Sequence, residues 1–143
     1  MAEGITKTMF KGNNTLHARS AGLYAVPGNP PSKNAIDVCG VYGIDIRDHR
    51  AQPLSQTLLN WADLIFCMEE YQDLEIRTLA RQEVPIRLLG RDIEGVPDEI
   101  PDPYGGDPRV YEETFRFLTQ AIVFHLGRFE ERRRYDREAE AAG

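Results

Sequence analysis

The segment Ile100–Asp107, Ile-Pro-Asp-Pro-Tyr-Gly-Gly-Asp, carries the carboxyl group that is best placed to do chemistry. Prolines on both sides of Asp102 restrict the backbone around it and so direct its side chain. A carboxyl group held on such a loop can protonate a leaving group, but an acid alone cleaves nothing and needs a nucleophile facing it. We therefore interpret Asp102 as a candidate general acid whose nucleophile must be sought elsewhere.

The only thiols in the sequence belong to Cys39 and Cys67. Their number and spacing favour neither a disulfide framework nor a metal site with paired ligands, so we expect reduced thiols and no bound metal. Cys39 falls on the apolar face of an expected helix and Cys67 falls within an apolar strand. Both side chains are therefore predicted to be small apolar groups of the core and not nucleophiles.

The Asp102 loop must be positioned by the surrounding elements, and the apolar pattern predicts a single α/β domain. Apolar residues that recur at steps of three or four predict helices at 1–10, 32–43, 54–61, 70–81 and 108–129. Unbroken apolar runs predict buried strands at 62–68 and 84–89, and 17–25 is predicted to be a short strand or an extended loop. This alternation favours a doubly wound, mainly parallel sheet flanked by helices, with ligands beyond the carboxyl ends of the strands.

Length and charge exclude several classes of protein. At 143 residues, with 41% hydrophobic and 28% charged residues, the chain suits one domain at 1–130 followed by a charged tail at 131–143. The net charge of −6 argues against a nucleic-acid partner, and the basic run Arg132–Arg134 is interleaved with acidic residues. No apolar run is long enough to span a membrane and no secretory signal is visible, which predicts a cytoplasmic protein.

Several stretches, in this order and spacing, resemble the low-molecular-weight protein-tyrosine phosphatases from the first residue to about 129. Met1–Gly4 is similar to the start of that family's first helix, Arg19–Gly22 to its second strand and Ala62–Met68 to its third. The sequence Asp102–Gly106 is similar to its general-acid loop. The stretch Ser20–Ala25 and the Gly-Gly pair resemble the bacterial branch that includes protein-arginine phosphatases.

The phosphate loop of that family has no counterpart in this sequence. In the family the first strand leads into Cys, five residues and Arg, then Ser or Thr and Pro, and directly afterwards Met-Ala-Glu, with which this chain begins. The sixth residue after Cys39 is Asp45 and the sixth after Cys67 is Asp73, so no Cys-x5-Arg exists. We therefore expect the central first strand and the catalytic loop to be absent, the fold to be weakened and this exact chain to be inactive. We further hypothesise that the true start lies about 15 residues upstream, enough for one strand and one loop.

The resemblance also implies roles for particular residues. In the complete family a cysteine attacks phosphorus while an aspartate protonates the leaving group, and the same aspartate then acts as base for hydrolysis of the phosphocysteine. By resemblance this aspartate is Asp102, Tyr104 and Tyr24 contact substrate at the pocket rim, and His49 has a supporting hydrogen-bond role. The implied substrate is a phosphorylated protein or a small phosphomonoester, with no metal or other cofactor.

An alternative from a different class is a phosphatase-like binding or regulatory module that no longer catalyses. A protein-arginine phosphatase or a relative of the arsenate reductases is a further reading, the latter disfavoured because resolving cysteines are lacking. Phosphotyrosine and phosphoarginine cannot be distinguished from this sequence, since the discriminating side chains lie in or near the missing loop. The oligomeric state is also left open.

Overall fold

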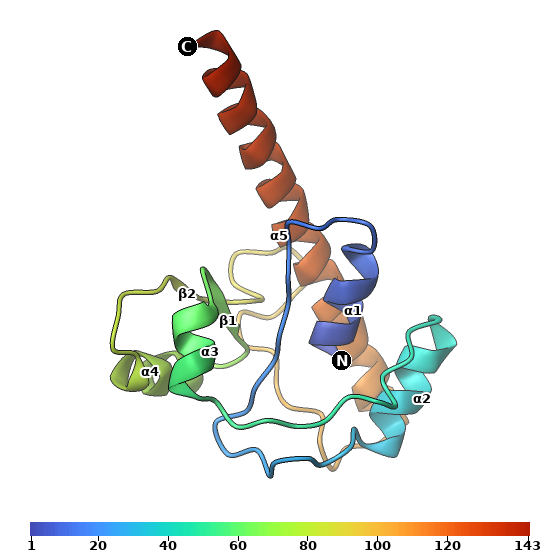
Figure 1. The fold of residues 1–143 in the computed structure, drawn as a ribbon. Coiled ribbons are helices and arrows are strands. Elements are labelled where there is room, and N and C mark those ends of the chain that lie inside the picture. The colour runs from blue at the N-terminus through green and yellow to red at the C-terminus, as the bar shows by residue number, and fades with distance from the viewer.

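The computed structural model describes all 143 residues and arranges five helices around two short strands (Figure 1). In chain order the elements are α1 (Ala2–Met9), α2 (Lys33–Val41), α3 (Gln56–Trp61), β1 (Ile65–Cys67), α4 (Glu70–Leu79), β2 (Ile86–Leu88) and α5 (Pro108–Ala142). Every helix expected from the apolar pattern is present. The sequence-based prediction of helix number and order is confirmed.

The capping residues explain where several helices begin. The hydroxyl oxygens of Ser32 and Ser55 each accept the backbone N–H three residues ahead, at 3.3 and 3.2 Å. The carboxylate of Asp107 accepts the N–H of Arg109 at 2.9 Å, and Pro108 occupies the first position of α5. These contacts satisfy N–H groups that a helix leaves free at its N-terminus. Asp107 is thus the residue that caps α5.

The sheet is smaller than the sequence predicts. It consists of β1 and β2 alone, paired in parallel with Ile65 opposite Ile86 and Cys67 opposite Leu88. The strand expected over 62–68 is reduced to three residues, and the segment 17–25 forms no strand beyond one isolated bridge at Gly22. A strand needs a hydrogen-bonded neighbour, and β1 has one on a single side only. The expected α/β class and parallel strand pairing are confirmed, with helices on both faces of the pair, while the sheet is limited to two strands.

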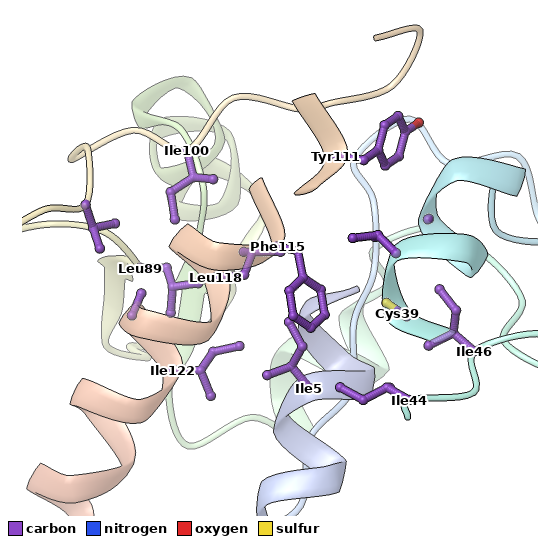
Figure 2. Packing of buried hydrophobic residues seen from close by; sticks show 14 residues of the cluster. Ile5, Cys39, Ile44, Ile46, Leu89, Ile100, Tyr111, Phe115, Leu118 and Ile122 are labelled. Atoms are coloured by element: carbon purple, nitrogen blue, oxygen red, sulfur yellow. The ribbon is translucent and has the colours of Figure 1, made fainter. Parts of the chain in front are cut away.

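Two hydrophobic clusters lie on opposite faces of the β1–β2 pair. The larger joins α1, α2 and α5, and Phe115 of α5 faces Ile5 of α1 at its centre (Figure 2). The smaller lies between the strands and the helices α3 and α4. Its buried members are Leu59, Cys67, Ile76, Val84, Ile86 and Leu88. Helices on both faces of a parallel pair are the α/β arrangement that the alternation of elements predicts.

The helix α5 begins as a core element and ends as a projection. Tyr111, Phe115, Leu118 and Ile122 form its buried stripe, and the helix then continues away from the body of the domain (Figure 1). The charged residues 131–142 belong to this same helix and are almost entirely exposed. None of the helices, α5 included, combines the length and apolar character needed to cross a membrane.

Candidate active site

The loop that carries Asp102 is fastened at the carboxyl end of β1. Ile100 is 1% exposed, and its N–H donates to the carbonyl of Met68 at 2.9 Å, directly after the strand. Next to it, the carboxylate of Glu99 accepts the N–H of Glu70 at 2.7 Å, at the first residue of α4. Asp102 therefore stands beyond a strand end and beside a helix N-terminus, where parallel α/β domains bind their ligands.

The acid loop is closed by its own hydrogen bonds. Asp102 Oδ1 accepts the N–H of Tyr104 at 3.0 Å, and Pro103 O accepts the N–H of Gly106 at 2.8 Å. Gly105 has a φ of 80°, a backbone conformation that favours glycine, and a Cβ on Gly106 would lie 2.9 Å from Pro103 O. One carboxylate oxygen is thus held by the loop, and the other oxygen of this exposed side chain has no hydrogen-bond partner within the protein.

A second polar group, centred on Glu3, lies at the start of α1. Glu3 Oε2 accepts both the N–H of Ser20, at 2.8 Å, and its hydroxyl, at 2.5 Å, while Oε1 pairs with Lys7 at 2.5 Å. Burial by itself raises the pKa of Glu3, but these hydrogen bonds outweigh it and the pKa lies below its ordinary value. Reasoning from sequence missed this contact, because a Glu and a Ser separated by seventeen residues carry no local signal.

His49 lies beside this group but is not hydrogen bonded to it. Its Nδ1 is 3.8 Å from Glu3 Oε2, which is an ion-pair distance if the ring is protonated and too long for a hydrogen bond. The side chain is 35% exposed. The supporting hydrogen-bond role expected for His49 stays a prediction.

The two rim tyrosines are both exposed. Tyr104 is 81% exposed on the acid loop, and Tyr24 is 77% exposed at the end of the extended segment. The hydroxyl of Tyr24 lies 2.7 and 2.8 Å from the two carboxylate oxygens of Glu75 on α4. This hydrogen bond raises the pKa of Tyr24 above its usual value. The contact of Tyr24 with α4 is a second feature that the sequence did not reveal.

The predicted residues fall into two groups that no direct contact joins. Asp102 and Tyr104 share the acid loop, and Tyr24 is tied to α4, whose first residue is held by that same loop through Glu99. His49 belongs with Glu3 near the start of α1. The structure therefore links Tyr24 to the acid loop through α4 and leaves His49 in a separate polar group.

Neither thiol is placed to act as the nucleophile. Cys39 is fully buried and Cys67 is 4% exposed, as predicted for core side chains. Burial raises the pKa of both thiols, that of Cys67 to about 11, so each is protonated near neutral pH. No three His, Cys, Asp or Glu side chains converge in a way that could hold a metal ion. These residues therefore offer a carboxyl group on a fastened loop and no accessible thiol.

Over most of its length the chain is similar to known proteins. The family model described as low molecular weight phosphotyrosine protein phosphatase matches residues 1–134. A probable low molecular weight protein-tyrosine-phosphatase, EpsP, of Ralstonia nicotianae is 31% identical over 85% of this chain and 81% of that protein. The protein-arginine-phosphatase of Bacillus subtilis is 25% identical over 80% of this chain and 77% of its own.

Solved structures show the same similarity in three dimensions. The low molecular weight protein tyrosine phosphatase from T. tengcongensis superimposes with a TM-score of 0.81 and 32% identity, covering 89% of this chain and 88% of that chain. The YwlE arginine phosphatase from Geobacillus stearothermophilus gives a TM-score of 0.80 at 23% identity, which is a likeness of fold alone.

Proposed function

Because the chain belongs to the low molecular weight phosphotyrosine protein phosphatase family, we propose that its acid loop serves phosphomonoester hydrolysis with Asp102 as general acid and base. The observation that carries this proposal is the fastening of the loop at the carboxyl end of β1, where Ile100 is buried and bonded to Met68. An acid contributes to catalysis only when its position is held, and this loop is held at both its backbone and its side chain.

In the proposed reaction a cysteine thiolate attacks phosphorus, the P–O bond to the leaving group breaks, and Asp102 gives its proton to the departing oxygen. Water then attacks the phosphocysteine, Asp102 takes the proton of that water, and the thiolate leaves with its electron pair. Metal chemistry has no part in this scheme. The exposed rings of Tyr104 and Tyr24 suit contact with the organic part of a phosphorylated protein.

We further propose that the 143-residue chain does not turn over phosphomonoesters by itself. Its sequence contains no Cys-x5-Arg, and both of its thiols are buried and protonated. Binding a phosphate dianion requires converging N–H donors and a cation, and stabilising its transition state requires them in place beforehand. We thus propose that these residues supply the acid, the rim of the pocket and the supporting fold. They do not supply the nucleophile or the groups that bind the phosphate.

The test is hydrolysis of p-nitrophenyl phosphate by the 143-residue chain, beside a version with a strand and a Cys-x5-Arg loop joined ahead of Met1. We expect turnover only in the longer protein, and Asp102→Asn in that protein to lower kcat by about 10²–10⁴-fold. Asp136→Asn, an exposed carboxylate on the projecting part of α5, is the matched control and should leave kcat unchanged.

Turnover by the 143-residue chain would overturn the proposal that it lacks a working nucleophile. An active longer protein whose kcat is insensitive to Asp102→Asn would overturn the role of Asp102. Two folded but inert proteins would overturn the hydrolytic function and favour a binding or regulatory module.

A further inference from the structure

We propose that the outer side of α4 binds an arginine side chain of another polypeptide, held by Tyr24, Tyr71 and Glu75. This inference concerns association and does not depend on the proposed hydrolysis. It rests on a carboxylate that no cation neutralises, on two exposed aromatic rings beside this carboxylate and on an exposed leucine next to them.

Glu75 carries a carboxylate without a cationic partner. Its two oxygens lie 2.7 and 2.8 Å from the hydroxyl of Tyr24, which is a neutral group. No Lys, Arg or His side chain of the protein forms an ion pair with Glu75, whereas Glu70 on the same helix is paired with Arg91 at 2.6 Å. A carboxylate has about four acceptor positions, so Glu75 keeps some of them for a donor from outside the protein.

Two exposed tyrosine rings lie beside this carboxylate. Tyr24 is 77% exposed and reaches Glu75 from the loop between α1 and α2. Tyr71 is 48% exposed and stands four residues ahead of Glu75, on the same side of α4. The hydrogen bond to Glu75 raises the pKa of Tyr24, and nearby Tyr71 adds to this effect. The two rings and the carboxylate therefore belong to one patch of surface.

Leu74 adds apolar surface to this patch. Its side chain is 69% exposed and lies three residues after Tyr71, so the two are neighbours on the outer side of α4. The inner side of the helix packs through the buried Ile76 against the strand pair, on the face opposite α1 (Figure 1). The patch is therefore open to solvent and separated by the strands from the N-terminal end of the chain.

An arginine side chain is the occupant that meets all of these features. Its guanidinium offers parallel N–H donors that fit a carboxylate and a flat cationic face that stacks on aromatic rings. Its methylene groups can lie along Leu74, as the stems of long cationic side chains do on apolar surface. A lysine ammonium is a compact, strongly hydrated charge that lacks both the fork and the flat face. An anionic side chain would be repelled by Glu75.

The patch adjoins the acid loop. Glu70, the first residue of α4, donates its N–H to Glu99 of that loop at 2.7 Å. Glu75 lies five residues further along the helix, which corresponds to about 7.5 Å. An extended chain spans about 3.3 Å per residue, so the residues that flank a bound arginine can reach the acid loop.

The experiment uses the 143-residue chain with the synthetic probe acetyl-Gly-Gly-Arg-Gly-Gly-amide and follows the backbone amides by NMR. The control probe carries citrulline, which keeps the shape of arginine without its charge. We expect the arginine probe to shift the amides of Leu74 and Glu75 in a saturable way at millimolar concentration, and to leave those of α2 unchanged. The citrulline probe should bind about tenfold more weakly, because it loses the charge-assisted bonds to Glu75.

Variants of the chain test the same contacts from the other side. Glu75→Gln should weaken binding of the arginine probe about tenfold. Glu138→Gln, at an exposed position of α5, removes the same charge from the protein and should leave binding unchanged. Tyr71→Ala should weaken binding several-fold, because one of the two rings is lost. Circular dichroism on each variant checks that the fold is retained.

Several outcomes would overturn the proposal. Equal binding of the arginine and citrulline probes, or equal effects of Glu75→Gln and Glu138→Gln, would show that only the net charge attracts the peptide. A lysine probe that binds as tightly as the arginine probe would overturn the assignment to arginine. Shifts of Leu74 and Glu75 that appear without probe as the chain is concentrated would also overturn it, by showing that a second copy of the chain fills the site.

Discussion

Two segments of this protein lack regular secondary structure but differ in how their backbones are satisfied. The acid loop, residues 99–107, bonds to Met68 and Glu70 at one end, caps α5 at the other and closes on itself between them. The extended segment Leu16–Arg19 makes no backbone hydrogen bond at all. The comparison shows that two loops in one domain can differ completely in whether their backbone N–H and C=O groups are hydrogen bonded within the protein.

The largest expected effect comes from the anchor of the acid loop. Ile100→Ala removes a side chain that is 1% exposed, so it should lower the free energy of unfolding by about 2–5 kcal/mol. The measurement is urea denaturation at equilibrium. Val26→Ala, at a side chain that is 60% exposed, is the control and should stay within about 0.5 kcal/mol of the parent. Similar losses for both variants would mean that the loop is not anchored through Ile100.

A glycine pair tests the closure of the same loop. Gly106→Ala would place a Cβ 2.9 Å from Pro103 O and 3.1 Å from the Val110 side chain, and should destabilise by about 1–3 kcal/mol. Gly127→Ala, in α5 with open space around it, should instead stabilise by up to about 1 kcal/mol. Thermal unfolding of the two variants under one set of conditions gives the comparison, and a stabilising Gly106→Ala would refute the tight turn.

The contact of Ser20, directly after the extended segment, with Glu3 should contribute less. Ser20→Ala removes one donor to the Glu3 carboxylate and should cost about 1–2 kcal/mol. Because the folded pKa of Glu3 is lowered, its contribution is present at neutral pH and is lost as pH falls from about 4.3 through the folded pKa. The free energy of unfolding should therefore fall less steeply between neutral and acidic pH in Glu3→Gln than in the parent. An unchanged slope would show that protonation of Glu3 is not linked to folding.

The smallest effect concerns Tyr24. Tyr24 is 77% exposed, yet the hydrogen bond to Glu75 raises its pKa. Glu75→Gln should return the pKa toward the usual value of about 10, as read from a spectrophotometric titration of the tyrosines. The same tyrosine titration in the parent and in Glu75→Gln would contradict the hydrogen bond between Tyr24 and Glu75.

Much of the fold could be predicted from local pattern, because helices satisfy their backbones within themselves. The caps at Ser32 and Asp107 and the stripe of α5 are visible in the sequence and recur in the structure. The strands were harder, since each depends on a partner distant in the chain. The run 62–68 became three paired residues, and 17–25 became an extended segment with one bridge.

The same division holds for the candidate site. Asp102 and its turn could be found from Pro, Asp and Gly alone, because their conformational preferences are local. The anchor of Ile100 to Met68, the pairing of Glu3 with Ser20 and the tie of Tyr24 to Glu75 could not, because these contacts join residues far apart in the chain.

By itself, the sequence determined the order of helices, the acid loop and the absence of a Cys-x5-Arg motif among these 143 residues. Only the tertiary structure decided that Glu3 bonds to Ser20, that His49 stands 3.8 Å from Glu3 and that a cavity borders the segment Leu16–Arg19. The physical reason is the distance along the chain over which each interaction acts. Torsional preferences and capping act within a few residues, whereas burial and strand pairing depend on which distant segments meet.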